Sequence, residues 1–217
     1  MSASSPYRLK EIGYGTHQAV IDLVERGARL LDVGAAGGYL SELAQRRRGA
    51  RVTAVEPSAV ACAECRRRGV PVIEGDVRAL LDDGTLAAEG PFDQILLADV
   101  LEHLADPDDA LRRLIGLLRP FGSMVVSLPN IAYARARMQL LRGRWEYEET
   151  GIFDRTHLRF FTRASARRML EAAGLRVERE IPIGPASYAI GRPGVAITRL
   201  RPELLASQLV FRAATRP

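Results

Sequence analysis

The sequence predicts an α/β fold in which a parallel sheet is covered by helices on both faces. Short apolar runs alternate with amphipathic segments along most of the chain, which is the pattern of strands joined by crossover helices. The chain has 217 residues, of which 47% are hydrophobic and 26% charged, and this suits one domain with a full core. We therefore expect a single domain over residues 1–217, and we find no internal repeat.

The strand candidates are runs of aliphatic residues that end near a small or acidic residue, as buried strands often do. In order they are ARLLDVG (28–34), RVTAVEP (51–57), VPVIEGD (70–76), FDQILLAD (92–99), GSMVVSLPN (122–130), RVEREIPI (176–183) and LLASQLVFRAA (204–214). Residues 1–27 precede the first of these runs, and we expect them to form a helical cap.

The clearest helix lies in DDALRRLIGLLRP (108–120), which places apolar residues on one face. These residues are Leu111, Leu114, Ile115 and Leu118. A second helix is expected to begin at Thr162 or Arg163 and to end at Gly174, because threonine favours helix starts and glycine favours helix ends. Between Pro129 and Thr162 the alternation stops, so we expect an insertion at 129–162.

The basic charge does not by itself indicate a nucleic-acid partner. The net charge is +5 and the pI about 9.7, and Lys10 is the only lysine among 31 basic side chains. The arginine runs 46–48 and 66–68 end predicted helices, where cations complement exposed carbonyl groups. We therefore expect no nucleic-acid partner.

The apolar runs are too short for a membrane segment. None approaches the ~18 residues that a membrane span needs, and residues 1–15 lack the apolar core of a signal peptide. The sequence predicts a cytoplasmic protein without a membrane partner.

The only two cysteines, Cys62 and Cys65, are spaced as C-x-x-C on a predicted helix. A structural zinc site needs four ligands, and no second Cys/His pair accompanies them among three histidines. We expect free thiols that are buried or half-buried.

The stretch DVGAAGG, from Asp32 to Gly38, joins the first strand to a helix through small residues. Gly34, Ala36 and Gly38 let the backbone approach a ligand at the carboxyl end of the strand, where doubly wound sheets bind ligands. Taken alone, the turn also fits a dinucleotide-binding protein or a tight turn without a ligand.

Acidic residues end the next two strands. Glu56 is placed to accept hydrogen bonds from the two hydroxyls of a ribose. Asp76 can accept from an exocyclic amine, while the Val77 amide meets a ring nitrogen. Two acids at successive strand ends suit adenosine.

The charges around the glycine loop argue against a pyrophosphate. No basic residue lies between positions 34 and 42, whereas Asp32 precedes the loop. An acid at this position suits an ammonium and a sulfonium.

These motifs resemble those of the class I S-adenosylmethionine-dependent methyltransferases. The similar segments, in the family's order and spacing, are LLDVGAAGGYLSELA, VTAVEPS, IEGDV, FDQILLADVLEHLADP and LLRPFGSMVVSLPN. The resemblance implies a Rossmann-like sheet of seven strands, mostly parallel with an antiparallel last strand, and S-adenosylmethionine as cofactor. It covers roughly Leu30 to Phe211, and the chain departs from it at Ala36, where the family usually has glycine.

The resemblance assigns cofactor contacts to individual residues. The methionine portion falls to Asp32, Gly34, Ala36 and Gly38, the ribose to Glu56, the adenine to Asp76 and Val77, and the reactive methyl group to the neighbourhood of Ala98 and Asp99.

Three polar residues after the fourth strand suggest either a metal site or acid–base chemistry. Asp99, Glu102 and His103 are spaced i, i+3 and i+4, which puts them on one face of a short helix, and His157 is a candidate fourth ligand. This set resembles the metal sites of ubiquinone-pathway (UbiG-like) O-methyltransferases and of small-RNA 2'-O-methyltransferases. A metal there would acidify a hydroxyl. Without one, His103 or His157 is the catalytic base or an orienting group.

The predicted insertion is rich in aromatic residues. Six of the thirteen aromatic residues lie between positions 133 and 161. An aromatic-walled segment over the carboxyl edge of a sheet suits a substrate lid. We expect Tyr133, Trp145, Tyr147 and His157 to contact substrate, although such rings can also simply anchor a long connection.

Three functions remain open from the sequence. The first is a methyltransferase acting on oxygen of a hydroxylated small molecule, such as a secondary metabolite, a sugar or a quinone-like compound. The second, from a distant resemblance to MetW, is a partner-activating module without turnover of its own. The third is a metal-dependent RNA 2'-O-methyltransferase, with Arg135, Arg137, Arg142 and Arg144 contacting phosphates. A homodimer and a complex with a partner enzyme both stay open.

Overall fold

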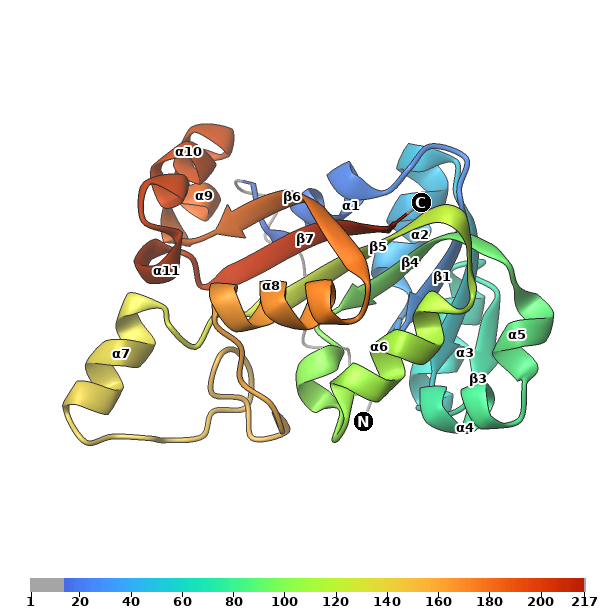
Figure 1. Ribbon diagram of the computed structural model, residues 1–217, viewed down its shortest axis with the longest axis horizontal. Helices are drawn as coiled ribbons and strands as arrows, with labels where there is room; N and C mark the ends of the chain where they lie inside the picture. The colour runs from blue at the N-terminus through green and yellow to red at the C-terminus, as the bar shows by residue number, and fades with distance from the viewer. Residues whose placement is uncertain (1–13, 217) are drawn as a thin grey trace.

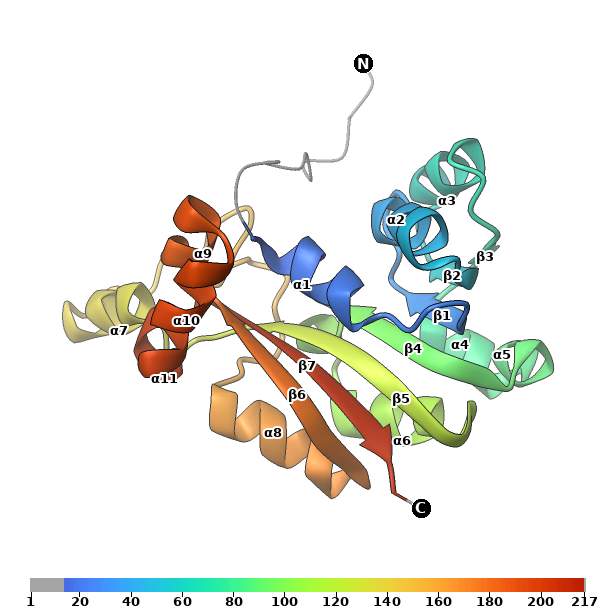
Figure 2. The ribbon, with the colours of Figure 1, turned by 90° about the horizontal axis from the view of Figure 1, so that it is seen from above.

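One sheet of seven strands forms the centre of the computed structural model, which describes residues 14–216 (Figures 1 and 2). The strands are β1 (Arg29–Val33), β2 (Arg51–Glu56), β3 (Val72–Glu74), β4 (Phe92–Ala98), β5 (Leu118–Pro129), β6 (Leu175–Ile183) and β7 (Gln208–Thr215). Their order is β3-β2-β1-β4-β5-β7-β6. Strands β1 to β5 pair in parallel, and β7 runs antiparallel between β5 and β6. The predicted Rossmann-like sheet with an antiparallel last strand is confirmed.

Helices cover both faces of this sheet, as predicted. They are α1 (Thr16–Leu23), α2 (Tyr39–Arg48), α3 (Ala59–Arg67), α4 (Val77–Asp82), α5 (Thr85–Glu89), the 3-10 helix η1 (Leu101–His103), α6 (Pro107–Ile115), α7 (Ala134–Leu141), α8 (Arg163–Ala172), α9 (Pro185–Ile190), α10 (Arg192–Leu200) and α11 (Pro202–Leu205). Figure 2 shows α1, α2 and α3 on one side of the sheet and α6 and α8 on the other.

Each face of the sheet has its own apolar core, because successive strand residues point to opposite sides. Leu31 of β1 packs in one core, together with side chains of α4, α5, α6 and α8. Leu30 points into the other core, which includes side chains of α1, α2 and α3. Both leucines are fully buried, so β1 is a central strand with no solvent-facing side.

Two predicted boundaries are wrong. The predicted helix 108–120 ends at Ile115, and Leu118 opens β5 instead, because the chain leaves the helix after Gly116 and Leu118 pairs with Phe92 of β4. The predicted strand 204–214 begins only at Gln208, because Pro202 starts the short helix α11.

Part of the predicted N-terminal cap, residues 1–13, lies outside the described residues. The described remainder contains α1, whose residues Ala19, Val20 and Ile21 are buried against the sheet. Within residues 14–216, no helix is both long and apolar enough to cross a membrane.

Helix α8 begins where the sequence predicts, at a capping box. The Thr162 Oγ1 accepts a hydrogen bond from Ser165 N (3.1 Å), and Ser165 Oγ accepts one from Thr162 N (2.9 Å). At the other end Gly174 has φ +96°, a conformation that glycine adopts without strain. Both ends of the helix are therefore set by local residues.

Replacing Thr162 with alanine should destabilise the protein by about 1 kcal/mol, because one backbone N–H of the first turn of α8 loses its acceptor. The free energy of unfolding is measured in urea, with Thr150→Ala as the matched control at an exposed loop position. Equal stability of the two variants would contradict the capping role.

Candidate active site

The glycine loop between β1 and α2 has left-handed backbone at positions that admit only glycine. Gly34 has φ +69°, and a Cβ on it would lie 2.9 Å from a methyl group of Val100. Gly38 has φ +74°, and a Cβ there would lie 2.9 Å from the Cys65 Sγ. Cys65 is thus a buried free thiol that packs under the loop. Cys62 on the same helix is also a buried free thiol, so the predicted state of both cysteines is confirmed.

Glu56 holds the loop to the end of β2. Its Oε2 accepts a hydrogen bond from Ala36 N (2.8 Å), and its Oε1 accepts one from Ser58 N (2.9 Å). Ala36, which stands where the methyltransferase family usually has glycine, has φ +48°. The charge-assisted hydrogen bond from Ala36 N to the Glu56 carboxylate holds this alanine in the left-handed conformation.

Asp32 is buried beneath the loop. The Ser41 hydroxyl donates to its Oδ2 at 2.6 Å. Burial raises the pKa of Asp32 to about 7, the Ser41 hydrogen bond opposes this shift, and the nearby Glu56 charge adds to it. A buried carboxyl group close to half-ionised at neutral pH is a site that a cationic ligand would favour.

A cavity opens above Asp32 at the carboxyl ends of β1 and β4. It is lined by five of the nine predicted cofactor residues, namely Asp32, Gly34, Ala36, Ala98 and Asp99. The other four, Gly38, Glu56, Asp76 and Val77, lie outside its lining. Asp76 is exposed and caps α4, where its Oδ1 accepts from Arg78 N (2.9 Å) and Ala79 N (3.3 Å).

Sequence patterns did not predict every residue that lines this cavity, and His17 and Arg68 are two of those missed. His17 comes from α1, and burial lowers its pKa. No sequence motif links the N-terminal helix to the glycine loop. Arg68 is the C-cap of α3, at a helix end that the sequence predicts. Its guanidinium pairs with Glu42 (2.9 Å) and Glu64 (3.0 Å) and lies over the Tyr39 ring.

Asp99 lies between this cavity and a cluster of histidines. It has φ +56°, so the chain bends there and η1 begins only at Leu101. The expectation that Asp99 shares a helix face with Glu102 and His103 is therefore wrong. Its Oδ1 accepts hydrogen bonds from Ser127 Oγ (2.8 Å) and from Gln208 Nε2.

Burial raises the pKa of Asp99, whereas the Ser127 hydrogen bond and the charges of His17 and His157 oppose this shift. The two histidines belong to different sites: His17 lines the cavity, and His157 belongs to the cluster beyond it. Asp99 therefore couples the two sites electrostatically.

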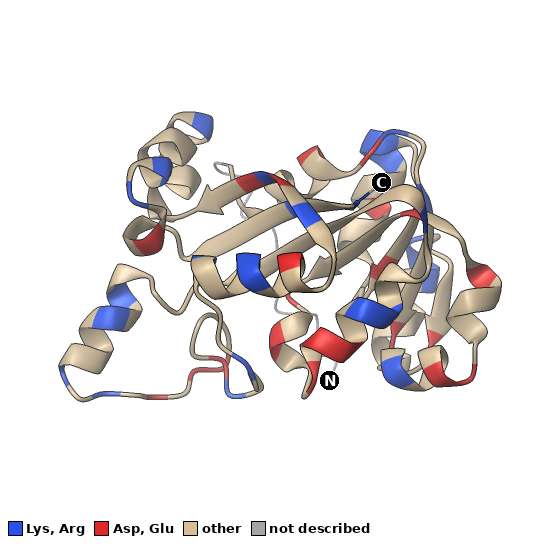
Figure 3. Ribbon diagram, viewed as in Figure 1, with Lys and Arg blue, Asp and Glu red and all other residues tan. Residues whose placement is uncertain are grey.

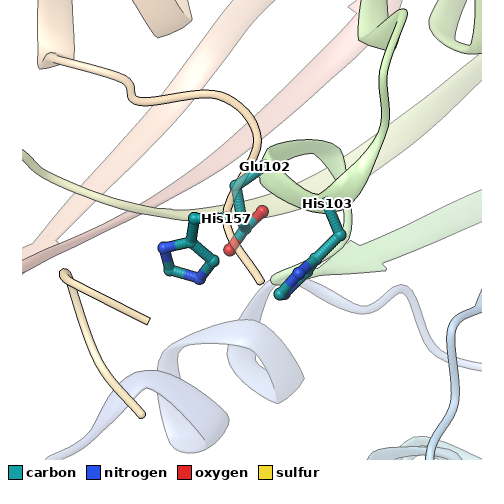
Figure 4. Close-up of side chains that lie close together, drawn as sticks. All are labelled: Glu102, His103 and His157. Carbon is teal, nitrogen blue, oxygen red and sulfur yellow. The ribbon is translucent and has the colours of Figure 1, made fainter. Parts of the chain in front are cut away.

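Glu102, His103 and His157 converge beside η1 (Figure 4). Their ligand atoms all lie within 4.8 Å of one another. Glu102 is only 1% exposed, and neither of its carboxylate oxygens has a hydrogen-bond partner within the described residues. Three of the four predicted metal ligands thus form a compact set, which does not include Asp99.

Burial makes the charged forms of Glu102 and His157 unfavourable in this cluster. Burial, with a contribution from Asp99, raises the pKa of Glu102 to about 9. Burial and the neighbouring His103 lower the pKa of His157. Burial thus favours the uncharged forms of Glu102 and His157, and both groups can act as ligands once a cation displaces the proton of Glu102.

The insertion brings His157 to the cluster through backbone hydrogen bonds. Leu158 N (2.8 Å) and Arg159 N (3.0 Å) both donate to Glu102 O. His157 Nδ1 lies 3.3 Å from Ile152 O, and His103 Nδ1 lies 3.1 Å from the Thr156 hydroxyl. The insertion and η1 therefore position the two imidazoles together.

Aromatic side chains extend from this cluster along the insertion. The Trp145 ring makes edge contacts with Tyr147 (6.3 Å between ring centroids), Phe153 (5.0 Å) and Phe160 (5.1 Å). Phe160 in turn lies 6.3 Å from the His157 ring. Tyr133, also predicted to contact substrate, stands at the N-cap of α7.

A mostly parallel sheet of this order, with a glycine loop after β1 and acids at the ends of β1, β2 and β4, defines the class of S-adenosylmethionine-dependent methyltransferase folds. A family model described as a methyltransferase domain matches residues 10–180, in agreement with the fold. The chain belongs to this methyltransferase family.

Curated relatives include ubiquinone biosynthesis O-methyltransferases. That of Aeromonas salmonicida (strain A449) is 32% identical over 155 residues, which are 70% of this chain and 64% of the relative. That of Caulobacter sp. (strain K31) is 39% identical over 108 residues, 48% of this chain and 42% of the relative. The aligned segments span about two thirds of these relatives or less.

Solved structures share the fold at low sequence identity. A SAM-dependent methyltransferase of Thermotoga maritima has a TM-score of 0.66 at 16% identity, covering 93% of this chain and 88% of its own. The N-methyltransferase NodS of Bradyrhizobium japonicum, solved with S-adenosyl-l-homocysteine, has a TM-score of 0.63 at 17% identity, covering 99% and 94%.

Replacing Glu102 with glutamine should stabilise the metal-free protein by about 1–3 kcal/mol at pH 7. The folded-state pKa of about 9 exceeds the ordinary 4.5, so native Glu102 keeps a proton that the unfolded chain releases, and stability falls as pH rises between these values. Glutamine mimics the protonated acid and does not titrate.

Urea unfolding at pH 5, 7 and 9 with a chelator present tests this expectation. The advantage of Glu102→Gln should grow with pH, whereas the exposed control Glu146→Gln should show no such trend. A constant difference across the three pH values would show that Glu102 is ionised in the folded protein.

Proposed function

We propose that this chain transfers a methyl group from S-adenosylmethionine to a hydroxyl of a small aromatic molecule, with a divalent cation held by Glu102, His103 and His157. The observation that carries the proposal is the carboxylate of Glu102, which is buried close to two imidazoles and has no hydrogen-bond partner among the residues that the structure describes. We assign the enzyme to the cytoplasm and residues 129–162 to its substrate lid.

The cavity above β1 suits the cofactor. Asp32 would take its ammonium group, and Gly34 and Gly38 let the loop backbone approach the methionine portion. At the neighbouring strand ends, Glu56 would take the ribose hydroxyls, and Asp76 with Val77 the adenine. When bound, S-adenosylmethionine supplies a methyl group activated by its sulfonium. The chain itself has mainly to bind and orient the two reactants.

One carboxylate and two imidazoles form a donor set that suits a divalent transition metal or magnesium with added water ligands. A cation bound there lowers the pKa of a coordinated hydroxyl. Glu102 would give up its proton on binding the cation, since the cation supplies the positive charge that the buried carboxylate lacks. Asp99, between cluster and cavity, would face the reacting atoms from the cofactor side.

The substrate class follows from the surroundings of His157. Phe160 and Trp145 continue the site with aromatic rings, which suit a flat ring that carries hydroxyl groups. The relatives named as ubiquinone biosynthesis O-methyltransferases favour the same class. A substrate with two adjacent hydroxyls would suit a site in which Glu102, His103 and His157 would hold a cation.

The affinity for S-adenosylhomocysteine should rise about tenfold between pH 5.5 and pH 7.5. Burial places the pKa of Asp32 at about 7, and a bound ammonium group favours the ionised carboxylate, so binding at lower pH must first remove a proton. Calorimetric titration at the two pH values measures this, and Asp32→Asn should bind weakly with little pH dependence. An unchanged pH dependence in Asp32→Asn would show that another group is responsible.

Methylation of a catechol by the native protein should fall by at least about tenfold on treatment with a chelator and return on addition of Mg²⁺ or Mn²⁺. The product is followed by mass spectrometry, and Glu102→Gln and His157→Gln should resemble the chelated protein. Full turnover in the presence of chelator would remove the cation from the proposal and leave His157 as the base.

A further inference from the structure

The segment after α7 turns back on the helix and encloses a cavity that the proposed reaction does not use. Gly143, at φ +68°, makes the turn, and Arg142 N and Arg144 N both donate to Gln139 O (3.1 and 2.9 Å). The cavity has a volume of about 300 Å³. Its lining consists of Arg135, Met138, Gln139, Arg142, Arg144 and Glu146.

Positive charge predominates around this cavity. Figure 3 shows basic segments on α7 and on the chain that follows it. Arg135 pairs with Glu148 (3.1 Å), but Arg142 and Arg144 form no ion pair with any residue of the part of the chain that the structure describes. Glu146 in the lining and Glu148, which pairs with Arg135, offset two of the three guanidinium charges, so the cavity keeps a formal excess of one positive charge.

The position of these arginines is not explained by helix ends alone. Arg142 at the C-cap of α7 complements exposed carbonyl groups, but Arg135 lies in the first turn, where a cation opposes the helix dipole. The Gln139 Oε1 is also buried, and no donor within residues 14–216 reaches it. Since the amide oxygen and nitrogen can exchange places by a side-chain flip, this amide can equally present N–H donors to an anion in the cavity.

The cavity adjoins, in the sequence, a row of aromatic rings that ends at His157 in the proposed methyl-acceptor site. Arg144 is followed by Trp145, whose ring contacts Phe160, and Phe160 contacts His157. A substrate with its hydroxyl at His157 can lie along these rings toward the arginines. The arrangement suits one compact anion more than a nucleic-acid strand, because Arg137, the fourth arginine of this segment, donates its Nε to Ala132 O (2.6 Å).

We propose that the α7 cavity binds a phosphate group of the substrate, so that the methyl acceptor is a phosphorylated hydroxyaromatic molecule or its diphosphate. Arginine forks match phosphate oxygens with paired hydrogen bonds, and Arg142 and Arg144, which have no ion-pair partner within the described residues, supply two guanidinium groups for such an anion. The proposal rests on the proposed function for the identity of the hydroxyaromatic portion, but phosphate binding is measurable without any methyl transfer.

Trp145 provides the readout, because it is the only tryptophan of the chain and adjoins Arg144. Phenyl phosphate and inorganic pyrophosphate should change its fluorescence on titration, and phenol should do so at least about tenfold more weakly, since it lacks the phosphate. The double variant Arg142→Gln/Arg144→Gln should lose at least about tenfold in affinity for phenyl phosphate. The control Arg112→Gln/Arg199→Gln, which changes two arginines on α6 and α10, should bind as the native protein does.

Affinity for S-adenosylhomocysteine, retained in both double variants, checks that they fold. The proposal is overturned if phenol binds as tightly as phenyl phosphate, or if both double variants bind phenyl phosphate equally. It is also overturned if only phosphatidylglycerol vesicles or an oligoribonucleotide, and no small phosphate, affect Trp145. If the native protein binds phenyl phosphate but methylates neither catechol nor a catechol that carries a phosphate group, the proposed function is rejected and this site stands.

Discussion

The carboxylate of Glu56 fixes the loop on which the whole cavity depends. By accepting hydrogen bonds from Ala36 N and Ser58 N, it ties the turn after β1 to the end of β2. A left-handed alanine costs about 1–2 kcal/mol, and a hydrogen bond to a charged group contributes about 1.5–3 kcal/mol, so the bond can offset the strain. Gly34 and Gly38 on either side have no such latitude, because Val100 and Cys65 occupy the space of a side chain.

Buried acids are the second feature that organises the site. Asp32, Asp99 and Glu102 lie at the carboxyl ends of β1 and β4, and burial raises the pKa of each one. Buried carboxyl groups of this kind destabilise a fold unless a positive charge lies beside them. An ammonium, a sulfonium and a divalent ion are the three positive groups that the proposed reaction brings to this edge of the sheet. The strand ends are therefore adapted to their ligands more than to stability.

Much of the fold was predictable from the sequence because its signals are local. Periodic apolar runs located the strands, and Thr162 with Gly174 located α8 to within two residues. Leu118 was misplaced because its apolar spacing fits a helix and a strand alike, and only pairing with Phe92 of β4 decides between them.

The candidate site was predictable to a lesser degree. Glu102, His103 and His157 do converge, although 53 residues lie between the two histidines in the sequence. The two imidazole rings contact each other, and His103 also contacts the Thr156 hydroxyl. Asp99 left the set because its positive φ ends the strand before η1 begins, which residue spacing does not reveal. His17 and Arg68 reach the cavity only through the packing of α1 and α3, which is a property of the assembled fold.

The cluster beside η1 is built from two separate parts of the chain. Glu102 and His103 belong to the sheet's own connection, whereas His157 comes from the insertion that also carries the aromatic rings. Exchanging this segment between relatives, in evolution or in the laboratory, would change the aromatic rings proposed to contact substrate and would remove a donor from the cluster in one step. If those rings select the substrate as proposed, point changes around Trp145 and Phe160 would alter the substrate range while keeping His157. A replacement segment would need its own histidine and the backbone N–H groups that donate to Glu102 O.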